Sequence, residues 1–499
     1  MSPIVTENAD VCSALDPKIL WSVHVLAPYA LVKNIDKSKD DIENDNGYFI
    51  TTLEHGEQMV TEWNPELRLG IKLAVDTIPQ VYRQTWHYVG LDSVNSVLDS
   101  ILVSELDHDF EGHLVPNFDC ANNNKAFSLS DHLSMNLGNK NVLLKTVILN
   151  FTDGMETDGW PGISIIRGLE QRRLAFTGAN STLYYLDSDK ALIKQHLIES
   201  CTPTPGYCNV YSQQDKDLDT LRYPSASIDS NPEAKGDLQW MEDEDLSNKA
   251  SILEDLSKLR FPLLVKPANS SSSRGISTKS VVDTPEEAYE RAMETKRIWG
   301  PVYVEEYIAG REYTVLVSGS FETGIKVYKV LERVFRSRIP ERERMLTYEM
   351  KWSNKHYGSD ETVDTASWWM QICPDVDQER LQPLARAIYA SFGGNGYCRM
   401  DLREDNRTGQ VFVIDVNANC SIDEDENCAM GKILKASGLT LGQFFSVLMD
   451  DAIRVRDNQL TKDNDHSMFK VLTSAAMDES LKHPNNLQAD TNRAVRVGA

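Results

Sequence analysis

Residues 261–275 read FPLLVKPANSSSSRG, and this stretch joins an apolar strand to a loop of small side chains. Phe261 to Val265 is long enough for a buried strand, and Pro267 ends it because proline has no N–H to donate to a ladder. The four serines and the closing Gly275 let the backbone approach an anion closely, and their N–H and hydroxyl groups supply donors. Lys266 adds a positive charge within reach of the same anion. A serine-rich surface turn is the alternative, and the rest of the chain decides between the two.

Length and composition indicate a globular protein of several domains. At 499 residues, the chain is long enough for roughly three domains of about 150 residues. It is 41% hydrophobic and 25% charged, and its net charge of -24 argues against binding nucleic acid through the overall field. The eight cysteines show no metal-like spacing, and no signal peptide or membrane-spanning run is evident. We therefore expect reduced thiols, a cytoplasmic location, and no nucleic-acid or membrane partner.

The clearest α/β pattern begins at Val142. Residues 143–150 (LLKTVILN) predict a strand, residues 163–170 the start of a helix, and residues 174–177 a short second strand. This order predicts a parallel α/β unit whose loop lies at the carboxyl edge of the sheet, where ligands usually bind. The first 140 residues are less clear, although residues 21–32 suit a strand and turn.

Two segments differ from their surroundings in charge. Residues 211–256 are polar and acidic, and we interpret them as an insertion or mobile excursion without a catalytic role. Residues 333–344 (RVFRSRIPERER) are rich in arginine. Alone they suit a solvated loop, but beside a phosphate site residues 331–352 are our candidate for a closing lid.

Two later strands carry acidic side chains. Residues 397–402 (YCRMDL) and 411–416 (VFVIDV) each place an aspartate in a mostly apolar run. Asp401, Asp415 and Asn417 offer hard oxygen ligands that suit Mg²⁺, which usually takes one or two carboxylates plus substrate phosphates. An aspartate at a strand end exposed to water is the alternative.

Taken in order, the motifs resemble a known family. FPLLVKPANSSSS with GIS, VYVEEYIAGRE, YEMK, GYCRMDL and VIDVNAN are similar to those of the ATP-grasp carboxylate–amine ligases, closest to the D-alanine–D-alanine ligases. The resemblance covers roughly residues 142–454, and the lysine helix within residues 174–206 supports it. It implies an ATP-grasp fold, with a Rossmann-like N-terminal domain (1–180) and two α+β domains that sandwich ATP (181–310, with an insertion at about 208–256, and 311–465). A C-terminal tail (466–499) follows.

The resemblance assigns roles to individual residues. The nucleotide-binding positions that match are Lys190, Lys266, Ser272, Ser273, Glu305, Glu306, Ile308, Glu312 and Lys351. Among them the lysines and serines match phosphate contacts, residues 305–308 the adenine-binding hinge, and Glu312 the acid on the ribose hydroxyls. The implied Mg²⁺ ligands are Asp401, Asp415 and Asn417. The implied catalytic residues are Arg399, which would stabilise the oxyanion, with Ser272 and Lys351.

The implied reaction forms an amide bond between an amino-acid-like carboxylate and an amine through an acyl phosphate, with ATP and Mg²⁺ as cofactors. The expected partners are the two small-molecule substrates, with a homodimer as a possible assembly. Two alternatives stay open. One is an ATP-grasp enzyme that transfers phosphate or acyl to a non-amine acceptor, and the other is a non-catalytic nucleotide-binding protein.

Several positions depart from the family pattern. Asp415 replaces the usual glutamate, Ser271 a glycine and Trp352 a tyrosine, and Cys420-Ser421 stands in place of a proline–glycine turn. The loop NFTDGMETDG lacks the usual histidine. These departures predict a substrate other than D-alanine. By the count from Asn417, Glu426 falls where the family holds the acceptor's carboxylate, so an acceptor with a cationic group is our hypothesis; a solvated acidic loop is the alternative.

Overall fold

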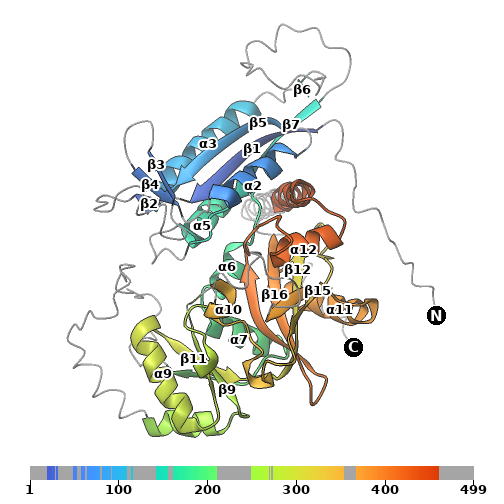
Figure 1. Cartoon of the computed structure of the whole chain (residues 1–499). Helices are drawn as coiled ribbons and strands as arrows, with labels where there is room; N and C mark the ends of the chain where they lie inside the picture. Colours follow the sequence, from blue (N-terminus) through green and yellow to red (C-terminus); the bar gives the residue numbers. More distant parts are fainter. Residues whose placement is uncertain are drawn as a thin grey trace, which may run out of the picture.

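The structure is a computed structural model. It describes residues 19–28, 30–31, 49–52, 58–61, 65–78, 81–91, 93–109, 114–115, 142–154, 161–210, 249–268, 270, 273–352 and 367–459. Figure 1 shows an N-terminal part, drawn in blue, beside a central part in yellow-green and a C-terminal part in orange, each built around a sheet. The predicted α/β class is confirmed.

The N-terminal sheet has the strand order β5-β1-β7-β6, and β1 pairs in parallel with both β5 and β7. A small separate sheet has the order β2-β4-β3. The elements of this part are β1 (Ile19–Pro28), β2 (Ala30–Leu31), β3 (Phe49–Thr52), β4 (Gln58–Thr61), α2 (Pro65–Asp76), β5 (Val81–Val89), α3 (Val94–Asp109), β6 (Leu114–Val115), β7 (Val142–Asn150) and α5 (Ile163–Gln171).

Helices cover both faces of this sheet, because its buried strands alternate their side chains between the two. Val23 and Val25 of β1 belong to a core shared with α2 and with a helix of residues 441–459, while Leu26 packs with α3 and α5. The parallel α/β unit is thus confirmed. The short strand expected at residues 174–177 is reduced to a parallel bridge between Phe176 and Ile148, with Ile148 N donating to Ala175 O and Thr177 N donating to Ile148 O.

The central sheet is antiparallel, in the order β10-β9-β11-β8. Helix α9 packs on it through Ala288 and Ala292, and it begins as the sequence predicts, with Thr284 capping and Pro285 in the first turn. The interpretation of residues 211–256 as a polar excursion is wrong at its end, because residues 249–257 form a helix and Leu256 is buried in this core. The elements are β8 (Tyr207–Val210), β9 (Leu263–Pro267), η3 (Thr278–Ser280), β10 (Val281–Val282), α9 (Pro285–Trp299) and β11 (Val302–Glu306).

The C-terminal sheet has the order β15-β14-β12-β16-β17, with β13 paired to β12. Its elements are β12 (Gly310–Ser318), β13 (Lys326–Val327), β14 (Leu331–Phe335), η4 (Glu341–Glu343), α10 (Tyr348–Trp352), β15 (Trp368–Ile372), α11 (Asp375–Ser391), β16 (Tyr397–Asp405), β17 (Val411–Ala418) and α12 (Ala429–Ala436). Helices α6 (Ser181–Asp187) and α7 (Lys190–Glu199) also share its core and contact β17.

The two faces of this sheet differ in chemistry. Tyr313 and Val315 of β12 pack with α11 in the core, whereas Glu312 and Thr314 point to the opposite face because successive side chains alternate. Helix α11 therefore covers one face. The other face, here called the polar face, carries Glu312 and Thr314, and toward the end of β12 it becomes apolar, where Leu316 packs with α12 and the helix of residues 441–459. No helix in the described ranges is long and apolar enough to cross a membrane.

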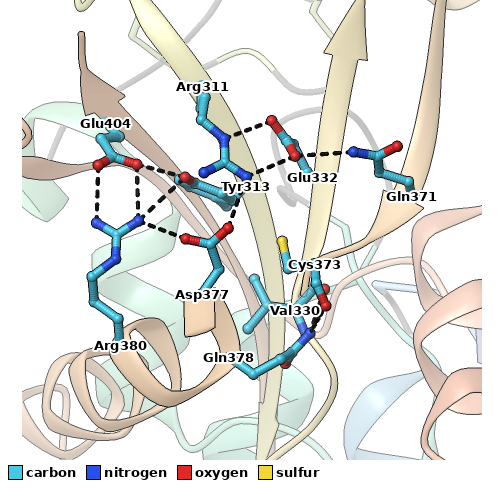
Figure 2. Close-up of polar contacts among 10 residues, drawn as sticks. All are labelled: Arg311, Tyr313, Val330, Glu332, Gln371, Cys373, Asp377, Gln378, Arg380 and Glu404. Carbon is cyan, nitrogen blue, oxygen red and sulfur yellow. Dashed lines mark hydrogen bonds and ion pairs between the residues drawn. The ribbon is translucent and has the colours of Figure 1, made fainter. Parts of the chain in front are cut away.

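A network of charged side chains attaches α11 to the sheet (Figure 2). Arg311 donates to Glu332 at 2.8 and 2.9 Å and to Asp377 at 2.8 Å. Arg380 of α11 donates to Glu404 at 2.9 and 3.0 Å and to Asp377 at 3.0 Å. Burial alone would raise the pKa of Asp377, but the two arginines outweigh it and hold that pKa below its ordinary value.

Replacing Arg380 with glutamine is expected to lower the free energy of unfolding at pH 7 by about 1–2 kcal/mol, since it removes charge-assisted hydrogen bonds at a half-exposed site. The pKa of Glu404 is also held low by Arg380. The contribution of both acids is present above their unfolded pKa near 4 and is lost as the pH falls through their lower folded pKa. In Arg380→Gln both acids lose this partner, so the loss of stability on acidification should begin at a higher pH than in the parent protein. Urea unfolding between pH 3 and 7 measures the free energy of unfolding at each pH, and Arg297→Gln, at an exposed position, is the control. If the free energy of unfolding depends on pH in the same way in both variants, Arg380 does not stabilise the two acids.

Candidate active site

The polar face of the C-terminal sheet gathers the acidic residues predicted to bind metal. In the β16–β17 ladder Asp401 stands directly opposite Asp415, and Arg399 opposite Asn417. Residues that are directly opposite, or two apart along a strand, share one face of the sheet. All four side chains therefore lie on the face opposite α11, as the two matching aspartate positions suggested.

Helix α7 brings a lysine to this face. Asp189 caps the helix by accepting from Ala191 N, so Lys190 stands in its first turn. Its Nζ lies 2.7 and 2.9 Å from the two carboxylate oxygens of Asp415. Burial alone would raise the pKa of Asp415, but the Lys190 ammonium outweighs it, so that pKa lies below its ordinary value. Asp415 is therefore ionised at neutral pH.

The end of β9 meets the same helix. Lys190 N donates to Ala268 O at 3.2 Å, which ties α7 to the strand that carries Lys266. Lys266 Nζ lies 2.5 Å from Glu305, and Lys194 Nζ lies 2.6 Å from the same carboxylate. Burial disfavours the charge of Glu305, but the two lysines outweigh it and lower its pKa.

Lys194 is a site residue that the sequence argument missed. It is fully buried, and besides Glu305 it donates to Thr204 Oγ1 at 2.8 Å. The sequence feature that could have identified Lys194 is its spacing from Lys190, because residues four apart lie on the same face of a helix. Truncating Glu305 would leave the buried charge of Lys194 without its ion-pair partner, whereas truncating Lys194 would leave Glu305 with Lys266 alone.

Asp401 is held by two neighbours on the sheet. Thr314 Oγ1 donates to its Oδ1 at 2.7 Å, and Arg399 Nη2 lies 3.4 Å from its Oδ2. Arg399 Nε is buried and has no hydrogen-bond partner among the described residues. Arg399 thus keeps a donor for a group that arrives in the site.

The donor set fits Mg²⁺ bound together with phosphate. No group of three or more His, Cys, Asp or Glu side chains in the described part of the chain is arranged to hold a metal. The candidate set is instead two carboxylates on paired strands, Asp401 and Asp415, with the amide oxygen of Asn417. Mg²⁺ commonly takes one or two carboxylates and completes its shell with phosphate oxygens and water.

Glu312 also lies on the polar face, between two arginines on neighbouring strands. It stands opposite Arg333 of β14 and Arg403 of β16, contacts Arg333, and lies 3.3 Å from Arg403 Nε. Arg403 was not predicted as part of the site, and Arg333 was predicted only within the arginine-rich lid segment. Opposite charges directly across a ladder stabilise each other, and the pair orients Glu312 at the position that the resemblance gives to the ribose.

The predicted hinge follows β11. Glu306 N donates to Gly206 O at 2.9 Å, and its carboxylate accepts from Arg260 N at 2.9 Å. Ile308 is buried. These contacts fix the backbone of the segment where the resemblance places the adenine.

The serine loop is described only in part. Ser272 lies outside the described residues. Ser273 has a positive φ of 61°, and its carbonyl accepts from Ile276 N at 3.1 Å. Small polar residues that take up such turns often present backbone N–H groups to anions.

Lys351 of α10 approaches the site from the covering segment. Burial, together with the nearby charges of Arg399 and Arg333, lowers its pKa to about 8, while Asp401 and Asp415 oppose the shift. The charges of Asp401 and Asp415 therefore act on Lys351, whose role in phosphate binding stays a prediction.

The pH dependence of ATP use should report this lysine. Above about pH 8 the free enzyme loses the Lys351 ammonium, so kcat/KM for ATP should fall by about 10-fold or more, the loss of a charge-assisted phosphate contact. Lys351→Arg keeps its charge at all accessible pH values. We expect this variant to lose the decline. A decline near pH 8 in both proteins would rule Lys351 out as its source.

Asp187 is a second residue that the sequence argument missed. Its Oδ2 accepts from Ala418 N at 3.0 Å, at the outer edge of β17. Burial raises its pKa to about 7, against the opposing effect of Lys190. At neutral pH this acid is therefore only partly ionised, so it can gain or lose a proton near Lys190 and Asp415.

The acidic run after Asn417 was expected to place Glu426 where the family holds the acceptor's carboxylate. Glu426 is 53% exposed, pairs with Lys435 of α12, and lines a cleft of about 270 Å³. Asp423 instead accepts from Cys428 Sγ at 3.1 Å. Burial and Asp423 raise the pKa of Cys428 to about 12, and Lys351 opposes the rise. Glu426 is therefore attached to α12 through Lys435, and Asp423 contacts Cys428.

Known proteins resemble part of this chain. Residues 236–450 match the family model described as the D-ala D-ala ligase C-terminus. The D-alanine–D-alanine ligase B of Clostridium tetani is 28% identical over 211 residues, which are 42% of this chain and 52% of that protein. The D-alanine–D-alanine ligase of Xylella fastidiosa is 24% identical over 274 residues, 54% of this chain and 70% of that protein.

Among solved structures, the D-alanine–D-alanine ligase from Bacillus anthracis complexed with ATP gives a TM-score of 0.46 at 13% identity, covering 88% of this chain and 99% of that one. The VanG D-Ala:D-Ser ligase from Enterococcus faecalis gives 0.42 at 17% identity, covering 63% and 74%. The first curated relatives are matched over only 52% and 58% of their length. Over residues 236–450 the chain is thus similar to the C-terminal part of the D-alanine–D-alanine ligases.

Proposed function

We propose that the protein is an ATP-dependent carboxylate–amine ligase that forms an amide bond and releases ADP. The observation that carries the proposal is the joint placement of Arg399, Asp401, Asp415 and Asn417 on one sheet face. Lys190 contacts Asp415 directly, and the charges of Asp401 and Asp415 both act on the pKa of Lys351. A site of this kind can hold several phosphate charges and also keep a donor for a developing oxyanion.

In the proposed reaction, the carboxylate of the first substrate attacks the γ-phosphate of ATP. This step brings negative groups together, so positive groups must neutralise them. Lys190, Lys266 and Lys351 would contact the phosphates, with Ser272 and Ser273 as further donors. Glu305, Glu306 and Ile308 would hold the adenine, and Glu312 the ribose.

Asp401, Asp415 and Asn417 would hold Mg²⁺. When bound, Mg²⁺ neutralises phosphate charge and polarises the γ-phosphoryl group toward attack. Lys190 occupies both oxygens of Asp415, so its ammonium must turn toward the phosphates as they bind.

The amine then attacks the acyl phosphate, and a negative charge develops on the carbonyl oxygen. Arg399 would donate to this oxyanion through its uncommitted Nε–H and its guanidinium fork. Water must be excluded because it would hydrolyse the mixed anhydride. Residues 331–335 form β14 inside the sheet, paired with β12 and β15, so the start of the predicted lid is wrong; residues 336–352, which carry Lys351, would cover the site. We further propose domain limits at residues 180, 310 and 465.

We also propose that the substrates differ from D-alanine. Asp415, Trp352 and the turn at Cys420 depart from the family pattern at positions around the site. The acidic run of residues 423–426, which follows the proposed metal ligand Asn417, favours an acceptor with a cationic group, because a carboxylate there would be repelled. The nucleophile would then be a basic amino acid or a diamine.

Product analysis tests the proposal. The protein is incubated with ATP, Mg²⁺ and pooled carboxylates, with arginine, lysine and diamines beside alanine, serine and valine as acceptors. We expect ADP, phosphate and a new amide, detected by mass spectrometry, with the cationic acceptors used fastest. A phosphorylated product without amide would favour the phosphate-transfer alternative, and no turnover would favour the nucleotide-binding alternative.

A further inference from the structure

A second cleft lies outside the candidate active site, where the end of the serine loop, helix α9 and helix α10 meet. Its volume is about 370 Å³, within the range of small-molecule sites. None of the residues assigned to nucleotide, metal or substrates lines it. Its walls combine two arginines with two aromatic rings.

The charge of the cleft is opposite to that of the whole chain. Arg274 and Arg291 both line it, although the chain has a net charge of -24. Arg291 Nη1 lies 3.1 Å from Glu294, whereas its Nε is buried and donates to nothing among the described residues. In the same described ranges no carboxylate pairs with Arg274. Two guanidinium groups with unused donors favour an anion, and a phosphate or carboxylate suits their fork geometry.

The rings of the cleft are accessible to a ligand. Trp299 and Tyr348 line it and are 40% and 47% exposed. Gly275 leaves room for the indole edge, because a Cβ there would come within 3.1 Å of Trp299 Nε1 and 2.6 Å of Pro267 Cγ, and its φ of +78° suits glycine. Exposed aromatic faces pair with planar rings in offset or edge-to-face contacts.

The cleft also joins two segments of the chain. Tyr348 N donates to Ile276 O at 3.1 Å, so the first residue of α10 is attached to the end of the serine loop. Arg291 Nη2 lies 3.5 Å from Ser277 Oγ on the same loop. A ligand in the cleft would contact α9, α10 and the loop together.

We propose that this cleft is a second ligand site, which binds a small anion that carries a planar ring. The anionic group lies on Arg274 and Arg291, and the ring lies against Trp299 and Tyr348. The site stands on its own residues and does not depend on the ligase reaction.

Calorimetric titration tests it with three probes: phenyl phosphate (ring and anion), inorganic phosphate (anion alone) and phenol (ring alone). We expect phenyl phosphate to bind at least 10-fold more tightly than either of the other two. Arg274→Gln and Arg291→Gln should each weaken phenyl phosphate binding about 10-fold. Trp299→Leu should remove most of the advantage of phenyl phosphate over phosphate, and Tyr348→Leu gives a second measurement should Trp299→Leu fail to fold.

The control separates this site from the proposed ATP site. Lys266→Gln removes a phosphate contact of the ATP site and should leave phenyl phosphate binding unchanged. Loss of binding in Lys266→Gln, together with parent-like binding in the arginine variants, would overturn the proposal. Equal affinities for phenyl phosphate and phosphate would overturn the role of the rings.

Discussion

Arg399→Lys is expected to lower kcat by about 10²–10³-fold, the usual cost of losing one oxyanion donor. A lysine keeps the charge but cannot present the planar fork of a guanidinium. Burial disfavours the charge of Arg399, but Asp401 outweighs it and holds the pKa of Arg399 above its ordinary value, so the group is charged throughout the working range. ATP binding should change little, because the interaction forms mainly in the transition state.

The measurement is steady-state kinetics together with calorimetric titration of ATP. Arg407→Lys is the matched control, because Arg407 is 66% exposed and lies in the turn after β16. A kcat within 3-fold of the parent protein in Arg399→Lys would remove this arginine from the reaction. A large loss of ATP affinity at unchanged kcat would reassign it to the phosphates.

The metal assignment gives the second large effect. Asp401→Asn and Asp415→Asn should each raise the Mg²⁺ concentration for half-maximal rate by more than about 10-fold, because a neutral amide replaces a charged oxygen ligand. Asp415→Asn also leaves Lys190 without its carboxylate. The stabilisation of the fold by Mg²⁺ with ADP, followed as the shift in thermal midpoint, should shrink in both variants.

This second readout is independent of turnover. Asp375→Asn is the control, an exposed aspartate in the first turn of α11 on the other side of the sheet. Circular dichroism checks that the fold is retained. Magnesium titrations that superimpose on the parent curve for both Asp401→Asn and Asp415→Asn would exclude them as ligands.

The sequence predicted those parts of the site that depend on local pattern. The two strands with aspartates are strongly apolar, so both the strands and the position of each aspartate were evident. Their adjacency was an inference, and the pairing of Asp401 with Asp415 confirms it. The cap at Thr284 was equally clear, because its signal lies within four residues.

The parts that the sequence did not predict depend on contacts between distant segments. Glu312 is held by Arg333 and Arg403, which lie 21 and 91 residues further along, and no local pattern indicates which strands will be neighbours. Lys194 meets Glu305 only once α7 packs beside β11. The helix of residues 249–257 was missed because a polar composition hid its single deeply buried leucine, Leu256.

The most direct test of the account is the fate of the carboxylate oxygen. A substrate identified by product analysis is labelled with ¹⁸O in its carboxylate and incubated with ATP, Mg²⁺ and the amine. Attack of that carboxylate on the γ-phosphate transfers one labelled oxygen to phosphate when the amide forms, so we predict one ¹⁸O atom in each phosphate released. Amide formation with unlabelled phosphate, or phosphate release that does not depend on the carboxylate, would contradict the proposed acyl phosphate and the function built on it.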